Sequence, residues 1–247
     1  MCITVKQMMQ IEENGHQMGF SRKFMMENAG AAATKRLVGK FGSVKGKDIL
    51  IFAGLGNNGG DALVMARHLV GYGAKVRVTL LGRPENIKTE ESKWNWSILE
   101  KMPSVYFSTT DLKNPNHTLK ISSSIDFDPT DDPTPDVIID GILGTGITGE
   151  LRRQTYASRN LNPYSLAIGY INYFQKGFNP SPSFTFAVDI PSGVDPDTGN
   201  KKSGHVTADM TVTFHRMKVG MPKAKDVCGE IFVEKIGIPP EAEIGVL

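Results

Sequence analysis

The sequence has few cysteines and no pattern of residues that would bind zinc. Its 247 residues include only two cysteines, Cys2 and Cys228, far apart in the chain. Two distant thiols do not make the disulfide framework of a small secreted domain, and they are ordinary in a reduced cytosolic protein. The five histidines are dispersed, without the spacing of a zinc or iron site.

Long runs of like charge or of apolar residues are also missing. The net charge is +2 without a basic stripe, which argues against an electrostatic nucleic-acid binder. The N-terminal residues carry charges where a signal peptide needs an apolar segment. The longest weakly polar stretch, 165–174, is too short to span a bilayer. We therefore expect a soluble cytoplasmic protein without a membrane or nucleic-acid partner.

Short apolar segments alternate with helical patterns along the chain. We expect one domain over residues 1–247, with a polar loop over 108–135. Thr4 is a candidate cap of the first helix and Gly15 its candidate end. The order predicts an α/β fold, a three-layer α/β/α sandwich of Rossmann-like type around a largely parallel sheet. The expected helices cover 6–13, 25–38, 62–71, 89–101 and 163–174, and the expected strands 47–53, 75–81, 105–107, 136–142, 184–190, 210–214 and 230–234.

The first loop of chemical interest is 54–61, Gly-Leu-Gly-Asn-Asn-Gly-Gly-Asp, between a strand and a helix. Its glycines allow the backbone to approach a ligand, and amides at a helix N-terminus suit an anion such as phosphate. Asp61 is placed either to cap the helix or to contact ligand hydroxyls. The structural alternative is a tight turn with a helix cap. A Walker loop is excluded because Gly-Lys-Ser/Thr does not follow.

Two aspartates each end an otherwise apolar strand. Asp140 precedes a second glycine-rich segment, and a buried carboxylate there needs a cation or loop amides as partners. Asp189 is followed by Ser192, and burial would suit Asp189 to acid–base chemistry, although a turn-capping role is the alternative. Because parallel strands end at one edge, we expect Asn58 and these three residues to converge. Their oxygens suit a hard cation.

These residues closely resemble the NAD(P)H-hydrate epimerase family, also called the YjeF N-terminal domain. The Asn-Asn-Gly-Gly-Asp and Asp-Ile-Pro-Ser-Gly motifs, on successive strand ends, are a specific pair. The matching segments are 26–30, 56–61, 66–69, 140–150, 187–195, 211–214 and 236–239.

The resemblance implies an isomerase of nicotinamide nucleotide repair that interconverts the R and S epimers of hydrated NADH and NADPH. It implies one K+ per subunit held by Asn58, Asp140 and Ser192, and Asp189 as the catalytic residue at the hydrated nicotinamide ring. It also implies a homodimer and a functional link to a separate ATP- or ADP-dependent dehydratase. The substrate-binding residues it implies are Asn57, Asn58, Gly59, Gly60, Asp61, Gly144, Thr145, Gly146, Ile147, Thr148, Gly149, Glu150 and Asp189.

Epimerising a carbon that bears a hydroxyl beside a ring nitrogen can proceed by loss of that hydroxyl to an iminium-like species. Return from the other face then requires an acid and a base. Asp189 is our first candidate for that role and Asp61 the second.

The sequence departs from the family pattern in several places. Leu55 stands for the usual proline and Ala62 for the usual glycine, and 153–161 is an apparent insertion. Three alternatives remain: a non-catalytic nucleotide-binding or dimerisation module of the same fold, a nucleotide-dependent oxidoreductase, and half of a bifunctional enzyme. The retained Asp140 and Asp189 argue against the first. The second is disfavoured because the first loop lacks the G-x-G-x-x-G spacing.

Overall fold

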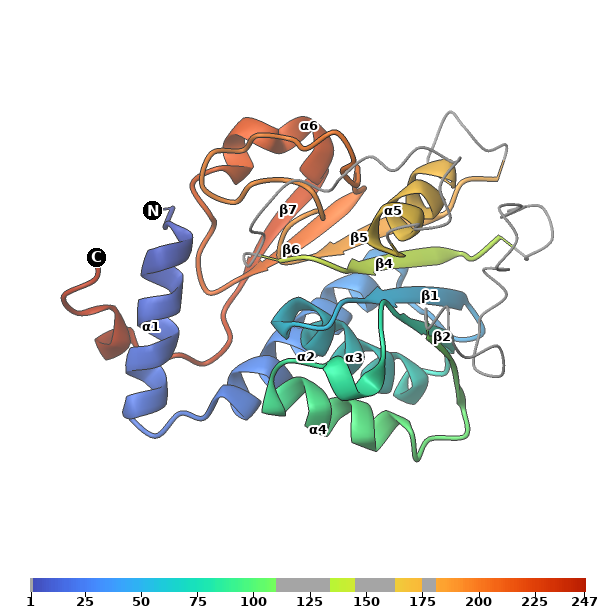
Figure 1. Cartoon of the computed structure of the whole chain (residues 1–247), viewed down its shortest axis with the longest axis horizontal. Coiled ribbons are helices and arrows are strands. Elements are labelled where there is room, and N and C mark those ends of the chain that lie inside the picture. Colours follow the sequence, from blue (N-terminus) through green and yellow to red (C-terminus); the bar gives the residue numbers. More distant parts are fainter. Residues whose placement is uncertain (1, 110–133, 145–162, 175–180) are drawn as a thin grey trace.

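The computed structural model describes residues 2–109, 134–144, 163–174 and 181–247. In this part of the chain, seven strands form one sheet in the order β3-β2-β1-β4-β5-β6-β7 (Figure 1). All six neighbouring pairs are parallel, so the predicted largely parallel sheet is confirmed. The strands are β1 (Asp48–Ala53), β2 (Lys75–Leu80), β3 (Val105–Thr109), β4 (Val137–Gly141), β5 (Phe184–Val188), β6 (Met210–Phe214) and β7 (Glu230–Glu234).

Helices cover both faces of the sheet, as expected for a three-layer sandwich (Figure 1). In one core cluster, the helices α1, α2, α3 and α4 pack against one face of the sheet. In a second cluster, α5 packs against the other face. Alternate residues of β1 divide between these clusters, with Ile51 in the first and Phe52 in the second. The helices are α1 (Val5–Gln17), α2 (Arg22–Phe41), α3 (Asn57–Gly71), α4 (Glu90–Leu99), α5 (Pro163–Tyr173) and α6 (Lys225–Cys228), with 3-10 turns η1 (Pro84–Asn86), η2 (Met221–Ala224) and η3 (Pro240–Glu243).

The first helix begins as predicted but ends later. Thr4 and Gln7 form a capping box: the Gln7 amide donates to Thr4 Oγ1 at 3.2 Å, and the Thr4 amide donates to Gln7 Oε1 at 2.9 Å. The prediction that Gly15 ends the helix is wrong. Gly15 is buried inside α1, where a Cβ would lie 3.1 Å from Met25 Cε, so its small size permits packing.

The chain reverses its course across the sheet between β1 and β4. It runs outward from β1 to β3 and then returns to place β4 on the other side of β1. Two glycines allow close packing there: a Cβ on Gly54 would lie 1.9 Å from the Ile142 carbonyl oxygen, and one on Gly141 would lie 2.3 Å from Ala62 Cβ. Open α/β sheets bind ligands at such a switch point, at the carboxyl ends of the strands.

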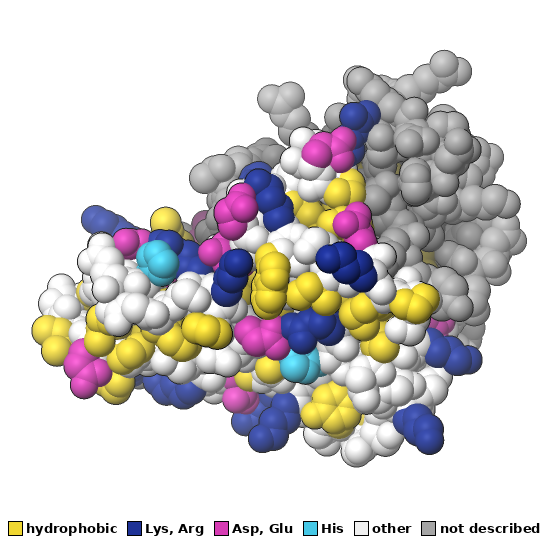
Figure 2. All heavy atoms as spheres, turned by 90° about the horizontal axis from the view of Figure 1, so that it is seen from below, with side chains coloured by type: hydrophobic (Ala, Val, Ile, Leu, Met, Phe, Trp, Pro, Cys, Tyr) yellow, Lys and Arg dark blue, Asp and Glu magenta, His cyan; other side chains and the backbone are white. Residues whose placement is uncertain are grey.

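The outer surface of α2 and α4 has mixed charge. Figure 2 shows acidic and basic side chains interspersed over this face. Within the residues that the structure describes, no helix combines the length and the apolar character needed to cross a bilayer.

Candidate functional site

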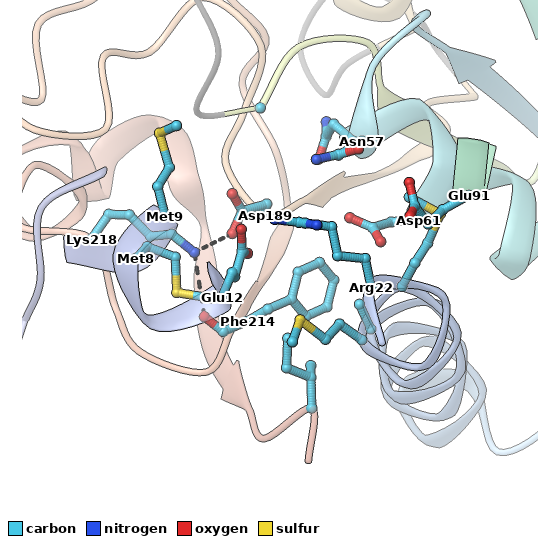
Figure 3. Close-up of a pocket in the computed structure, with 16 residues that line it drawn as sticks. Met8, Met9, Glu12, Arg22, Asn57, Asp61, Glu91, Asp189, Phe214 and Lys218 are labelled. Atoms are coloured by element: carbon cyan, nitrogen blue, oxygen red, sulfur yellow. Dashed lines mark hydrogen bonds and ion pairs between the residues drawn. The ribbon is translucent and has the colours of Figure 1, made fainter. Parts of the chain in front are cut away.

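A cavity of about 120 Å³ lies beyond the carboxyl ends of the strands (Figure 3). Methionines, alanine, isoleucine and phenylalanine form its apolar wall, while carboxylates, amides, an arginine and a lysine form its polar wall. The lining residues are Met8, Met9, Glu12, Arg22, Met25, Met26, Ala29, Asn57, Asn58, Asp61, Glu91, Gly144, Asp189, Phe214, Lys218 and Ile236.

Asp189 follows directly after β5 and has an unusual backbone conformation. Its φ of +63° lies in the left-handed region, which aspartate tolerates better than most residues. Its carboxylate accepts a hydrogen bond from Thr213 Oγ1 at 2.9 Å and an ion-paired contact from Lys218 Nζ. These partners come from β6 and the loop after it, so the carboxylate is oriented by residues of a neighbouring strand rather than by its own turn.

Lys218 is a fully buried lysine, with only 1% of its surface exposed. Besides pairing with Asp189, its Nζ donates to Thr213 Oγ1 at 2.8 Å and to the Phe214 carbonyl at 3.4 Å. A buried ammonium group is costly unless it is paired and hydrogen-bonded, and Lys218 meets both conditions. Lys218 and Asp189 therefore form a compact ionic unit on the cavity wall.

Two further carboxyl groups line the same cavity. Burial raises the pKa of the Glu12 carboxyl on α1 to about 7; Lys218 opposes the rise and Asp189 adds to it. Burial also raises the pKa of Asp61 on α3 well above its ordinary value, and the nearby charges of Asp189 and Glu12 raise it further. Both carboxyl groups therefore hold their protons more tightly in the cavity than they would in water.

Asp140 is completely buried at the end of β4. Its carboxylate accepts hydrogen bonds from the Ser192 amide at 2.7 Å, Ser192 Oγ at 2.6 Å and the Ile142 amide at 3.1 Å. Burial raises the pKa of Asp140 to about 6, although these hydrogen bonds lower it. Ser192 Oγ in turn accepts from the Leu143 amide at 2.9 Å, which ties the loops after β4 and β5 together.

Asn58 lies in the first turn of α3 with an unsatisfied side chain. Both polar atoms of its amide are buried, and neither has a hydrogen-bond partner in the described structure. A Cβ on Gly144 would lie 3.2 Å from Asn58 Oδ1, so the segment after Asp140 passes directly over this amide. Buried amides are normally hydrogen-bonded, and an orphaned oxygen here is consistent with a bound ion or ligand group.

The cavity adjoins a larger cleft of about 710 Å³. Met9, Glu12, Arg22, Asn57, Asn58 and Gly144 line both spaces. Basic side chains of Lys6, Arg22 and Lys88 also border the cleft. The site therefore combines a small inner cavity, rich in carboxyl groups, with an outer cleft whose cationic side chains lie beside Glu12 and Glu13.

The structure places the predicted site residues as follows. Asn57, Asn58, Asp61, Gly144 and Asp189 line the inner cavity. The first loop is shorter than expected, because α3 already begins at Asn57 rather than at 62. Gly59 and Gly60 are buried in the first turn of α3, and Asp140 and Ser192 are buried behind the cavity wall. The remaining predicted residues fall outside the described part of the chain: Thr145, Gly146, Ile147, Thr148, Gly149, Glu150 and the expected insertion 153–161.

The capping role considered for Asp61 is wrong. Gly56 is the N-cap of α3, and Asp61 is the fifth residue of the helix. Its side chain faces the cavity instead (Figure 3).

Three residues of the site were missed in the sequence. Glu12 lies four residues after the buried Met8, on the same face of α1. An acidic residue on the apolar face of a helix was therefore the sequence pattern that could have indicated it. Lys218 lies in the loop after β6, at the same sheet edge as the two aspartates, but its burial has no signature in the sequence. Arg22 opens α2 and reaches the cavity.

Comparisons with known proteins agree with this architecture. The family described as YjeF-related protein N-terminus matches residues 22–220. A Nitrosopumilus maritimus protein named NAD(P)H-hydrate epimerase is 59% identical over 245 residues, 99% of each chain. A Cenarchaeum symbiosum protein of the same name is 54% identical over the full length of both chains.

More distant relatives extend the comparison. The bifunctional NAD(P)H-hydrate repair enzyme Nnr of Methanothermobacter thermautotrophicus is 41% identical over 94% of this chain, which corresponds to 39% of its own length. The crystal structure of yeast YNL200c superposes with a TM-score of 0.68 at 25% identity, covering 90% of this chain and 84% of the yeast chain. The family resemblance expected from the motifs is confirmed: the chain belongs to the family of YjeF-related N-terminal domains.

Proposed function

We propose that the protein is an NAD(P)H-hydrate epimerase, an isomerase that interconverts the R and S epimers of hydrated NADH and NADPH. The observation that carries the proposal is a cavity lined by carboxyl groups at the switch point of a chain whose full-length relatives bear that name. Epimerisation at one carbon needs proton donors and acceptors, and this cavity supplies both.

The two adjoining spaces match the two parts of such a substrate. The main-chain amides of Asn57 and Asn58, at the N-terminus of α3, provide donors for a phosphate oxygen. Lys6 and Lys88 at the outer cleft offer positive charge to a pyrophosphate. The apolar wall of the inner cavity, which includes Phe214, would then receive the hydrated ring.

The reaction at the ring can be written so that atoms balance. A proton is transferred to the hydroxyl on the carbon beside the ring nitrogen, the carbon–oxygen bond breaks, and water leaves. The nitrogen lone pair forms the iminium bond. Water then adds to the opposite face and gives up a proton. Asp189 is the candidate for contact with the ring, because it lines the cavity and its carboxylate is held by the ion pair with Lys218.

A potassium ion fits the residues behind the cavity. Asn58 Oδ1 is buried without a partner, and Asp140 is a buried carboxylate with only neutral hydrogen-bond donors among its described contacts. Ser192 adds a hydroxyl oxygen beside Asp140. Neutral and anionic oxygens of this kind suit a hard cation. Bound there, K+ would supply positive charge that keeps Asp140 ionised and holds the loops together.

Activity can be tested directly on the purified protein. The R epimer of hydrated NADH should be converted to the S epimer, as followed by chromatography, and the same test applies to hydrated NADPH. Asp189→Ala should abolish conversion. Asp226→Asn, which removes a carboxylate from an exposed ion pair with Lys201, is the matched control and should remain active. A folded wild-type protein that leaves both substrates unchanged would refute the proposal.

Potassium binding needs a readout other than activity. Thermal denaturation in tetramethylammonium buffer should shift upward on addition of K+, and Asn58→Ala should reduce that shift. A wild-type protein with identical midpoints in both salts would argue against the cation site.

A non-catalytic binding module of the same fold is the competing proposal. It predicts substrate binding without conversion. The retained Asp61, Asp140 and Asp189 around one site favour the enzyme. We also propose, from the names of the bifunctional relatives, that a separate dehydratase consumes the S epimer, and, from the family, that the protein is a cytoplasmic homodimer.

A further inference from the structure

Three carboxyl groups share the cavity with one buried ammonium group. Glu12, Asp61 and Asp189 provide the carboxyls, and Lys218 provides the ammonium. Of these three described carboxyl groups, Asp189 is the one that forms an ion pair with Lys218. In Figure 3, Asp61 comes from the α3 side of the cavity, whereas Glu12, Asp189 and Lys218 lie together on the other side. The cavity is therefore electrically asymmetric across its width.

The Asp189 side of the cavity is built to hold a negative charge. Lys218 and Thr213 both donate to the same oxygen, Oδ1, and each is fixed by further contacts. Thr213 is completely buried in β6, and the Lys218 ammonium also reaches the Phe214 carbonyl. The hydrogen bond and the cation are both directed at one oxygen of a residue that lines the cavity, and together they stabilise the carboxylate.

The Asp61 side is built differently. Within the described residues, no hydrogen bond or ion pair reaches the Asp61 carboxyl group. The charged groups that face it are Glu12 from α1, Arg22 from α2, Glu91 from α4 and the pair Asp189–Lys218. Burial and the neighbouring acids raise the pKa of Asp61, with Lys218 opposing. Two titratable groups in environments that differ in this way divide into an acid and a base.

We propose that Asp61 and Asp189 act as an acid–base pair on opposite sides of the hydrated ring, and that Lys218 is the positioning residue that holds Asp189 as the carboxylate. This inference rests on the proposed function and assigns roles within it. Asp61 gives its proton to the departing hydroxyl, the carbon–oxygen bond breaks, and water leaves on that side. Water on the other side attacks the iminium carbon and gives its proton to Asp189.

The second step returns the iminium electron pair to the ring nitrogen and leaves Asp61 ionised and Asp189 protonated. Proton exchange through solvent restores the starting state. The opposite epimer reacts by the same steps in reverse order, so one cavity serves both directions.

The kinetic test compares variants of both carboxyls. Asp61→Asn should reduce kcat by about 100-fold or more, the scale of a lost general acid, while KM changes little. The exposed pair Lys201–Asp226 supplies the matched controls Asp226→Asn and Lys201→Met, which should behave as wild type. Full activity of a folded Asp61→Asn protein would overturn the assignment of the acid.

The role of Lys218 is tested by the split between kcat and KM. In Lys218→Met, kcat should fall while KM changes little, because the Asp189 carboxylate loses the cation that holds it in place. Lys218→Arg should restore kcat in part, and Thr213→Val should lower kcat by less than Lys218→Met does. If Lys218→Met does not fold, Thr213→Val tests the same set of contacts. An unchanged kcat in the folded variants would refute the positioning role.

A measurement without substrate separates this inference from the proposed function. Carbon-13 NMR of aspartate labelled at the side-chain carboxyl reports each charge state directly. At neutral pH, the resonance lost in Asp61→Asn should be that of a protonated carboxyl, and the one lost in Asp189→Asn that of a carboxylate. If both resonances are those of carboxylates, the division into an acid and a base is refuted, even if the enzyme is active. If the expected pattern is found in a protein without activity, the result counts against the epimerase function alone.

Discussion

Replacing Glu12 by glutamine should stabilise the protein at alkaline pH. Burial raises the pKa of Glu12 from 4.5 to about 7, so the folded state binds this proton more tightly than the unfolded chain does. The stability from that proton is fully present below pH 4.5 and is lost as pH rises through about 7. At about 1.4 kcal/mol per pH unit, the shift corresponds to at most about 3 kcal/mol.

Urea unfolding between pH 4.5 and 8.5, at constant potassium concentration, measures this effect. At the acidic end, the free energies of unfolding of wild type and Glu12→Gln should agree, because glutamine replaces a protonated acid of the same shape. At the alkaline end, the variant should be more stable by up to about 3 kcal/mol. Asp61 and Asp140 contribute to the pH dependence of both proteins, so the difference between the two curves reports Glu12 and its coupling to Asp61.

Glu13 provides the control with the opposite sign. It is the next residue along α1, it pairs with Arg22 on the surface, and its pKa is lowered first by a hydrogen bond from Gln17. Glu13→Gln should therefore leave the protein no more stable than wild type at alkaline pH. If Glu12→Gln behaves like Glu13→Gln, or if its advantage persists unchanged at pH 4.5, the reasoning from burial is wrong.

Three further changes test the packing, the helix cap and the orphaned amide. Gly141→Ala would place a Cβ 2.3 Å from Ala62 Cβ and should lower the free energy of unfolding by about 1–3 kcal/mol, as measured in urea; an unaffected midpoint would show that α3 moves freely against β4. Thr4→Ala removes the capping box with Gln7 and should destabilise the protein by about 1 kcal/mol in thermal unfolding; a loss no larger than that of an exposed Ser→Ala substitution would contradict the cap. Asn58→Ala should be nearly neutral for stability without potassium, since the amide has no described partner; a loss of several kcal/mol in tetramethylammonium buffer would show that Asn58 is hydrogen-bonded after all.

The sheet was predictable because its central strands are apolar on both faces. Residues 49–53 of β1 and 137–139 of β4 are all apolar, and the burial of these strands on both faces explains that pattern. The start of α3 was not predictable from composition. Glycine and asparagine are poor helix formers, yet Asn57 through Gly60 form its first turn, because that turn is packed against the loop after β4.

The site was predictable where it follows strand ends and unpredictable elsewhere. Asp189 stands out because a charge directly follows an apolar strand. Lys218 does not, because its burial depends on a partner 29 residues away and on Thr213 between them. Glu12 depends on the docking of α1 beside the cavity, a tertiary contact that periodicity in α1 cannot specify.

The left-handed backbone at Asp189 restricts how this position can be engineered. Aspartate and asparagine tolerate a φ of +63°, so Asp189→Asn removes the charge while the main chain keeps its course. Asp189→Glu retains the charge but places a longer side chain on a backbone that disfavours it. The charge and the length of the side chain at this position therefore cannot be varied independently. A redesigned cavity that needs a longer acidic side chain would have to place its base at the end of a different strand.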